Sequence, residues 1–570
     1  MFMFKNYIRG RIPDLSLGLL TSLIGTIVFY KILGININEF YYPLGSGDYL
    51  NVISIAKNFI DGGNFTSNLK LGFPVGQFMG SYPTLDWLHL IEIWVLSQFI
   101  SNPFGIFTTF IGYITFKTAF ISYFLGRIFL NKIFSTIFTF VMVLNPGRIQ
   151  RVIEHPFIAD TSSLFFGVAA IALSILGFNS LGLNLKYRFV LATLFLFIVS
   201  ISGLYWALIV LMLTSITILH KLINKTIKSS DLYLLMTYLS LLAWSFYFNK
   251  FFEFSKVGSM SFERFVFESE LYGGKLASLF LPSPKSGLEF LATLREQFDN
   301  LVLTSYEGNS WLPLLGIFGN FAIVLLTLFF RNGKTIQNEK VDFLLTSWFT
   351  LVLFYISSGF GLLFSFFLFT DIRAWGRFSL AISIFATLFI LVLLNEKWKT
   401  TKLKKRFKSI LGLLLIGLIF VDLNTSRARI DLESSKILAA DLNSFMMSLE
   451  SNLVPNCAMA QLPFIRFPEE PPKVKMRDYD SLWPYLYSEN IKFSYGSFKS
   501  DDEFQVNFFS NLESSNISQA LLSRNGYCGI IIDTFGYEAT ELEGVINKVD
   551  SQSFKFKITS ESKRWIAYVI

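Results

Sequence analysis

The stretch LSLGLLTSLIGTIVFYKIL, residues 15–33, decides the fold of this chain, together with the motif Gly45-Ser46-Gly47-Asp48-Tyr49 that follows it. Arg9 and Arg11 precede the apolar stretch, which is long enough to cross a membrane. No small-residue cleavage site follows it, so we expect an uncleaved span rather than a signal peptide. The motif then places a single carboxylate, that of Asp48, at the start of a long loop.

The composition is that of a multi-span membrane protein. Of the 570 residues, 52% are hydrophobic and only 16% are charged, and the mean hydropathy is +0.50. Soluble domains usually carry about 25% charged residues. The net charge of +8 does not indicate a nucleic-acid partner, because residues 425–570 carry 15 Lys and Arg against 19 Asp and Glu. The positive excess therefore lies in the membrane part of the chain.

Apolar segments of spanning length recur along the first three quarters of the sequence. We expect about eleven spans, at residues 15–33, 104–126, 133–146, 161–179, 188–202, 203–220, 232–248, 311–330, 341–358, 376–394 and 409–423.

Charge in the connecting loops predicts the orientation. Alternate loops are basic, namely 127–132, 186–188, 221–228, 331–340 and 397–408. The last of these has seven basic residues in twelve. Because cytoplasmic loops are enriched in Lys and Arg, these loops should lie inside. The long loops 34–103 and 249–310 and the C-terminal part then lie outside, which predicts a multi-pass protein of the cytoplasmic (inner) membrane with its N-terminus inside.

The chain divides into two expected domains, a transmembrane domain over residues 1–424 and a soluble extracytoplasmic α/β domain over residues 425–570. In the second domain, short apolar runs near 457–462, 528–533, 554–558 and 564–569 predict strands, and stretches near 479–490, 502–523 and 538–549 predict helices. Cys457 and Cys528 are the two cysteines of the chain. They are either unpaired structural residues or, if this domain faces an oxidising compartment, partners in a disulfide.

Asp48 is the first candidate for chemistry. A carboxylate within hydrogen-bond reach of an acceptor hydroxyl takes its proton as that hydroxyl attacks a sugar carbon. The alternative is a structural role, because Ser46 and Asp48 both suit the N-cap of a helix that begins near Tyr49.

A second candidate is the polar loop 145–160, which the predicted topology places on the same side as Asp48. It concentrates ionisable residues between two spans, more than a short connector requires. It either binds substrate or forms an internally ion-paired loop at the membrane surface. The residues expected to contact substrate are Arg148, Arg151, Glu154, His155 and Asp160.

A third candidate is Asp371-Ile372-Arg373-Ala374-Trp375-Gly376-Arg377, at the start of a span. Arg373 and Arg377 are four residues apart, so on a helix they would share one face. Two guanidinium groups on the outer side suit a phosphate or diphosphate group. The alternatives are binding of a phospholipid headgroup and an ion pair with Asp371.

The long outer loop 249–310 and its continuation to Trp311 are the fourth candidate. Loops of this length inside compact proteins are usually functional. Tyr272, Glu307 and Trp311 are the aromatic and acidic residues expected to contact a sugar, and the alternative is an ordinary packed loop.

At these residues the chain resembles the GT-C superfamily, membrane glycosyltransferases that use polyprenyl-phosphate-linked sugars. Shared features are the acidic residue soon after the first span, interfacial helices in that loop, and a later outer loop with a soluble domain. Within this superfamily it is most similar to a bacterial group labelled sugar translocase or glycosyltransferase. The fragments that carry this likeness are residues 372–377, 417–425, 460–464, 478–480 and 493–496.

The resemblance implies an enzyme, a hexosyl- or pentosyltransferase that moves a sugar from a polyprenyl-phosphate carrier to a glycan or lipid acceptor with inversion. Asp48 matches the catalytic carboxylate, and Arg373 and Arg377 lie where the lipid phosphate would be held. Relatives often have two adjacent acidic residues in the first loop, whereas Tyr49 follows Asp48 here. No cofactor is expected, and metal use stays open.

Two other functions remain in view. A flippase for lipid-linked sugars would need ionisable residues in the middle of its spans, where Lys117 is an exception to otherwise uncharged segments. A non-catalytic scaffold in polysaccharide assembly would tolerate the loss of Asp48 or Arg373. In every case the expected partners are membrane lipids and lipid-linked sugars, not nucleic acid.

Overall fold

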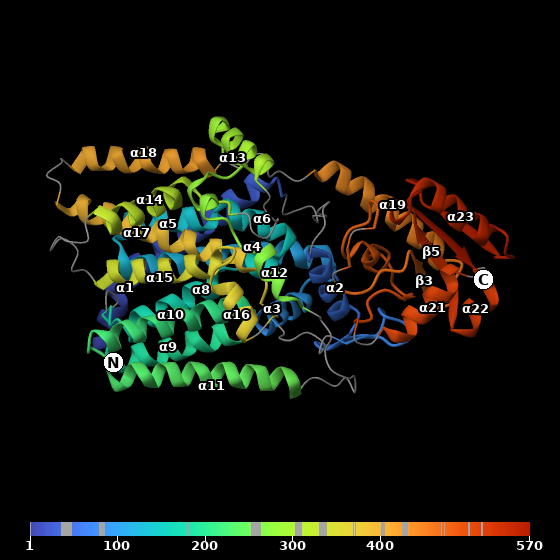
Figure 1. Cartoon of the computed structure of the whole chain (residues 1–570), viewed down its shortest axis with the longest axis horizontal. Helices are drawn as coiled ribbons and strands as arrows, with labels where there is room; N and C mark the ends of the chain where they lie inside the picture. Colours follow the sequence, from blue (N-terminus) through green and yellow to red (C-terminus); the bar gives the residue numbers. More distant parts are fainter. Residues whose placement is uncertain are drawn as a thin grey trace.

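The structure is a computed structural model that combines a long helical bundle with a smaller C-terminal unit at one end (Figure 1). It describes residues 2–35, 48–78, 86–178, 182–251, 264–302, 310–329, 339–368, 370, 372–400, 405–423, 431–468, 470–471, 473–499, 502–514 and 517–570. The N-terminus lies at the end of the bundle away from the C-terminal unit (Figure 1).

Helices occupy all the segments expected to span the membrane. They are α1 (Phe2–Leu33), α4 (Pro103–Phe129), α5 (Lys132–Val143), α8 (Ser162–Ser174), α9 (Leu185–Ser200), α10 (Leu204–Ile223), α11 (Ser229–Phe251), α14 (Leu314–Phe329), α15 (Glu339–Tyr355), α17 (Phe378–Thr400) and α18 (Lys405–Leu423).

Among the described residues, five helical segments are long and apolar enough to cross a membrane by themselves: 14–33, 103–129, 156–174, 204–223 and 375–400. A span needs about 20 residues, and helices such as α5, with 12, fall short of this length. The chain is therefore a membrane protein by its apolar helices, and the number of eleven spans stays a prediction.

Asparagine caps fix where several helices begin. Asn102 accepts hydrogen bonds from the backbone N–H groups of Phe104 and Gly105, at 2.9 and 3.0 Å, and Pro103 is the first residue of α4. These groups have no partner inside the helix, and proline has no N–H to satisfy at that position. The caps of α5 and α9 are also asparagines.

Short elements connect the long helices. From the first loop come α2 (Tyr49–Ile60), β1 (Ser67–Asn68), β2 (Gln77–Phe78) and α3 (Trp87–Ser97). Later loops contribute α6 (Pro146–Glu154), α7 (Pro156–Ala159), α12 (Val266–Leu271), η2 (Leu276–Phe280), α13 (Glu289–Leu301), α16 (Phe360–Phe367) and η3 (Trp375–Arg377).

The C-terminal unit, which we define as the described residues from 431 onward, contains a five-stranded sheet in the order β4-β3-β5-β7-β6. Strands β4, β3 and β5 are parallel, and β7 and β6 continue the sheet antiparallel. The strands are β3 (Ala458–Leu462), β4 (Lys492–Phe493), β5 (Tyr527–Asp533), β6 (Phe556–Thr559) and β7 (Trp565–Val569).

The C-terminal unit also contains helices and one disulfide bond. They are α19 (Leu432–Glu450), η5 (Asp480–Leu482), α20 (Trp483–Leu486), α21 (Glu503–Ser514), α22 (Gln519–Arg524), η6 (Thr534–Gly536) and α23 (Ala539–Asp550). Cys457, just before β3, forms a disulfide with Cys528 on β5. Of the two alternatives for the cysteines, the structure therefore has the disulfide.

The first loop is joined to the C-terminal unit by backbone hydrogen bonds. The N–H groups of Gly72 and Phe73 donate to the carbonyls of Tyr495 and Phe493, at 2.8 and 2.9 Å. The hydroxyl of Tyr527 donates to the carbonyl of Phe73 at 2.9 Å. The C-terminal unit is thus fixed to the same loop that begins with Asp48.

Candidate active site

Asp48 lies directly before α2 and is held there by its backbone. Its N–H donates to the carbonyl of Glu154 at 2.7 Å, and its own carbonyl accepts from Val52 at 2.9 Å. Its side chain makes no capping hydrogen bond to α2, although Asp48 occupies the N-cap position. The carboxylate is therefore not used in the structural role that was the alternative to catalysis.

His155 contacts this carboxylate. Its Nδ1 lies 2.7 Å from Oδ2 of Asp48, and the two side chains are 17% and 43% exposed. The position of His155 follows from the sequence around it, because Pro156 begins a new short helix and α6 must end before it. The pair is accessible to a substrate and joins the first loop to the loop 145–160.

A second carboxylate, that of Asp86, lies near Asp48. Burial raises the pKa of Asp86, and the negative charge of Asp48 adds to this effect, whereas His89 and Arg377 act in the opposite direction. Asp86 does not cap α3 with its side chain. A Cβ atom at Gly203 would lie 2.5 Å from its Oδ1, so a larger residue where α10 begins would displace the carboxylate.

Arg377 supplies positive charge near the carboxylate of Asp86. Its guanidinium lies over the ring of Tyr205, 4.7 Å from the ring centre, and the hydroxyl of Tyr205 accepts from the N–H of Ala374 at 3.1 Å. Because Arg377 also acts electrostatically on Asp86, the site contains a half-buried cation near this second carboxylate.

The expectation that Arg373 and Arg377 share one helix face is wrong. Residues 372–374 are not helical, η3 covers only Trp375–Arg377, and α17 begins at Phe378. The N–H of Gly376 donates to the carbonyl of Tyr272 at 2.9 Å, which holds this segment out of the helix. Arg373 pairs instead with Glu268 at 2.9 Å. The two guanidinium groups therefore have different partners.

Comparison with solved structures identifies this architecture. ArnT from Cupriavidus metallidurans bound to undecaprenyl phosphate aligns with a TM-score of 0.54 at 10% identity, over 96% of this chain and 97% of ArnT. The arabinofuranosyltransferase AftD from Mycobacteria aligns with a TM-score of 0.52 at 9% identity, over 97% of this chain and 40% of AftD. The chain has the GT-C fold. No protein-family model and no curated protein sequence matches it.

Within this GT-C fold, Arg148 lies away from solvent. Its side chain is fully buried and donates from Nε to the carbonyl of Ala159, from Nη1 to Val143 and from Nη2 to the hydroxyl of Thr115, at 2.9, 3.1 and 3.0 Å. These bonds tie α6 to α4 and to the end of α7. This geometry indicates a structural role for Arg148 rather than contact with substrate.

Asp160 is likewise enclosed, in a cluster of ionisable residues inside the GT-C bundle. Its Oδ2 lies 2.7 Å from Nζ of Lys117 and 3.0 Å from Nε2 of His89. Lys117 also pairs with Glu92. His89, Glu92 and Asp160 have the spacing of a metal site, but the ammonium group of Lys117 already contacts both carboxylates. The cluster is held together by ion pairs and a hydrogen bond among its own members.

Arg151 and Glu154 lie on α6 beside the Asp48–His155 pair. Arg151 is buried, and its carbonyl accepts from the N–H of His155 at 2.7 Å. Glu154 holds the backbone of Asp48, and its charge acts on Lys285, whose pKa is lowered by burial. Lys285 was not expected from the sequence, and its amine lies over the ring of Trp311, 5.2 Å from the ring centre.

The residues expected from the sequence to contact a sugar lie in different places. The ring of Tyr272 lies under Arg373, with 5.0 Å between the guanidinium carbon and the ring centre. The carbonyl of Trp311 accepts from the N–H of Gly147 at 3.0 Å, which brings the long outer loop onto α6. Glu307 and Asp371 lie outside the described residues.

Sequence reasoning missed Asp86. It directly precedes the apolar helix α3 and belongs to the same long loop as Asp48. An acidic residue at the edge of an apolar segment is the signal that could have drawn attention to it. Its proximity to Asp48 depends on the way in which α3 packs against α2 and α4, which the sequence does not show.

Proposed function

We propose that this chain is a membrane glycosyltransferase that transfers a sugar from a polyprenyl-phosphate carrier to a glycan or lipid acceptor. The observation that carries the proposal is the carboxylate of Asp48, which is 43% exposed, hydrogen-bonded to His155 and not used as a helix cap. The GT-C fold supports the same reaction class. The reaction takes place on the outer face of the cytoplasmic membrane.

In the proposed step, an acceptor hydroxyl transfers its proton to a carboxylate oxygen of Asp48. The hydroxyl oxygen forms a bond to the anomeric carbon of the donor sugar as the bond from that carbon to the phosphate oxygen breaks. The electron pair of the broken bond stays with the phosphate, and polyprenyl phosphate leaves. A positioned general base contributes about 10²- to 10⁴-fold to such a step. A single displacement inverts the anomeric centre.

His155 positions the base in this proposal. A ring N–H at Nδ1, in the tautomer that donates, fixes the orientation of the Asp48 carboxylate through the 2.7 Å contact. The free lone pairs of the carboxylate then point to the acceptor. Arg377 stabilises the negative charge that grows on the departing phosphate, because a preorganised cation stabilises the transition state more than the ground state.

Asp86 completes the proposed site as a positioning residue. Its charge acts on both Asp48 and Arg377. Asp86 therefore attracts the guanidinium group of Arg377 and helps to keep it at the site. Tyr272, Trp311 and Lys285 are the proposed contacts for the sugar and the lipid phosphate around this centre.

The C-terminal unit has a structural role in the proposal and supports its orientation. Its bonds to Gly72 and Phe73 attach it to the loop that begins with Asp48. The disulfide between Cys457 and Cys528 fits an extracytoplasmic location, because disulfides persist in oxidising compartments. The acceptor therefore approaches Asp48 from the side of this unit.

A flippase receives less support from the buried charges. Ionisable residues inside spans often mark a transport pathway. Lys117 is the exception noted in the sequence, and it is paired with both Glu92 and Asp160. A pathway residue that binds cargo needs charge that is not already neutralised by its neighbours.

The proposal is tested with purified protein in nanodiscs, a panel of polyprenyl-phosphate sugars and membrane-extract acceptors. We expect donor-dependent release of free polyprenyl phosphate and a product with the inverted anomeric configuration. Retention would overturn the single-displacement step. Absence of release across the panel, combined with movement of a labelled lipid-sugar between leaflets, would replace the enzyme with a flippase.

A further inference from the structure

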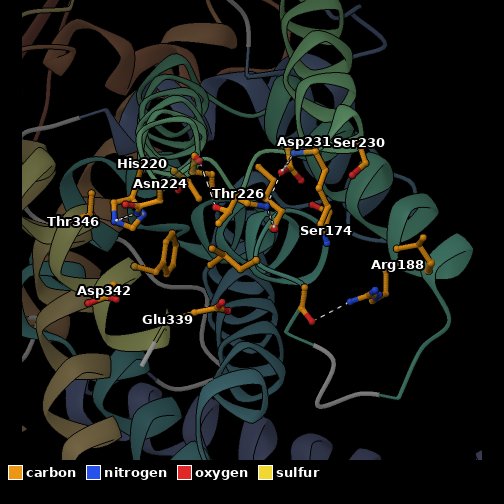
Figure 2. A pocket seen from close by; sticks show the side chains of 18 residues that line it. Ser174, Arg188, His220, Asn224, Thr226, Ser230, Asp231, Glu339, Asp342 and Thr346 are labelled. Carbon is orange, nitrogen blue, oxygen red and sulfur yellow. Dashed lines mark hydrogen bonds and ion pairs between the residues drawn. The ribbon is translucent and has the colours of Figure 1, made fainter. Parts of the chain in front are cut away.

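A cavity of about 430 Å³ lies at the other end of the helical bundle from Asp48. Helix α8 connects the two regions, because it begins just after Asp160 and ends at Ser174, which lines the cavity (Figure 2). At 1.5 Å per residue its 13 residues separate them by about 20 Å. The starts of α9, α11 and α15 and the end of α10 form the remaining walls.

A neutral ion pair forms part of the wall of this cavity. Nζ of Lys221 lies 2.6 Å from Oδ2 of Asp231 and donates to the carbonyl of Ile175 at 2.9 Å. The backbone N–H of Lys228 also donates to Asp231, at 3.0 Å. These bonds connect the ends of α8 and α10 with the start of α11, so the cavity has a defined wall.

Two carboxylates line the cavity without an ion-pair partner in the described part of the chain. They belong to Glu339 and Asp342 at the start of α15, and Asp342 is in electrostatic range of Glu339 and His220. In Figure 2, Glu339 and Asp342 lie on one side of the cavity and Arg188 lies on the other. This first side is suited to a cation that donates hydrogen bonds.

The other side carries positive charge. Arg188 donates from Nη1 to the carbonyl of Gly177 at 3.1 Å, and its Nε is buried without a hydrogen-bond partner among the described residues. Lys228 also lines the cavity. A guanidinium fork with donors to spare is suited to a phosphate group.

We propose that this cavity binds a phosphate–ammonium zwitterion, the headgroup of phosphatidylethanolamine in the surrounding membrane. A purely anionic ligand would face Glu339 and Asp342, and a purely cationic one would face Arg188 and Lys228. Ile175, Leu176 and Phe343 give the cavity an apolar part for the glycerol backbone, as ligand pockets usually have. The position at helix ends is where lipid headgroups lie.

The test measures lipid binding to the full-length purified protein by native mass spectrometry. Phosphatidylethanolamine and phosphatidylglycerol compete at equal concentrations. We expect wild type to prefer phosphatidylethanolamine at least fivefold. The double variant Glu339→Gln/Asp342→Asn should lose that preference, Arg188→Gln should weaken binding of both lipids, and Lys186→Gln, an exposed residue outside the cavity, should behave as wild type. Equal binding of the two lipids by wild type would overturn the proposal.

Two further arms use wild type alone, so they do not depend on variants that fold. Phosphatidylcholine, which lacks N–H donors on its quaternary ammonium, should compete at least fivefold less well than phosphatidylethanolamine. Free phosphoethanolamine should not displace the lipid at equal concentration. Equal competition by phosphatidylcholine would contradict the carboxylate contacts, and displacement by free phosphoethanolamine would show that the ligand is a soluble zwitterion rather than a lipid.

Discussion

Nδ1 of His155 lies 2.7 Å from Oδ2 of Asp48, and this contact joins two loops whose residues are 107 positions apart. The backbone reinforces it, because the N–H of Asp48 donates to the carbonyl of Glu154, the residue before His155. The orientation of the proposed base is thus set by the end of α6. A change at His155 should alter the rate of transfer more than the binding of substrate.

His155→Ala is therefore expected to lower kcat about 100-fold with little change in KM, since a misplaced base slows chemistry without removing substrate contacts. His155→Asn keeps an N–H donor near the position of Nδ1 and should recover part of the rate. Steady-state kinetics of the three proteins measures both parameters. A rise in KM alone, or equal losses in the two variants, would contradict a positioning role.

Asp86→Asn should raise the Tm at pH 7 and lower the rate of transfer. Because burial raises the pKa of Asp86, wild type loses stability as the pH rises from the ordinary aspartate value, about 3.9, through the raised pKa of the folded state. The amide does not ionise and escapes this loss. We predict a higher Tm than wild type at pH 7, a difference that disappears toward pH 4, and transfer reduced about 10- to 100-fold.

Thermal melts across this pH range, with transfer assays alongside, measure both effects of Asp86→Asn. Glu433→Gln, an exposed change of the same chemical kind, is the matched control. If Asp86→Asn had a lower Tm than wild type at pH 7, the carboxylate would be a stabilising group. Full transfer activity in this variant would show that Asp86 has no role in the transfer reaction.

Substitution of Arg377 should lower the rate of transfer, whereas substitution of Arg373 should lower the stability of the protein. Arg377→Ala is expected to lower transfer about 10²- to 10³-fold with little change in Tm, and Arg377→Lys should recover a minor part. Arg373→Ala leaves Glu268 without its 2.9 Å partner and should lower the free energy of unfolding by about 1–3 kcal/mol. Transfer rates and melting curves of the three variants distinguish the two roles; identical behaviour would contradict them.

The sequence predicted the parts of the site that depend on local signals. Asp48 follows the first span, and His155 precedes a proline that ends α6, so both were candidates before their contact was known. Their pairing depends on tertiary packing. The helix expected through Arg373 and Arg377 failed because a backbone bond from Gly376 to Tyr272 replaces a bond within the helix.

For the fold too, the sequence predicted the elements that have a strong local signal and missed those that depend on tertiary packing. Long apolar segments indicate helices wherever they occur, whereas strand β4 has only two residues and gives no periodic signal. A short helix such as α5, with 12 residues, falls below the length of a span, so its place in the membrane depends also on the helices packed against it. The role of Arg148 was also hidden, because its three acceptors lie on separate segments of the chain.

The disulfide gives a test of orientation. We predict that peptide mapping of protein purified without reductant finds Cys457 linked to Cys528, since an extracytoplasmic domain meets oxidising conditions. The double variant Cys457→Ser/Cys528→Ser should lose about 4 kcal/mol of stability in the C-terminal unit, the amount that loop-closure entropy gives for a sequence separation of 71 residues. Free thiols in the wild-type protein would place this unit inside the cell.

The most direct test of the account compares Asp48→Asn with wild type in the release of polyprenyl phosphate from the donor that wild type uses. Glu433→Gln is the control for the change from carboxylate to amide, and Tm shows that each protein is folded. We predict that Asp48→Asn releases at least about 100-fold less while Glu433→Gln is unchanged. Release by folded Asp48→Asn at the wild-type rate would contradict the central claim that Asp48 is the catalytic base.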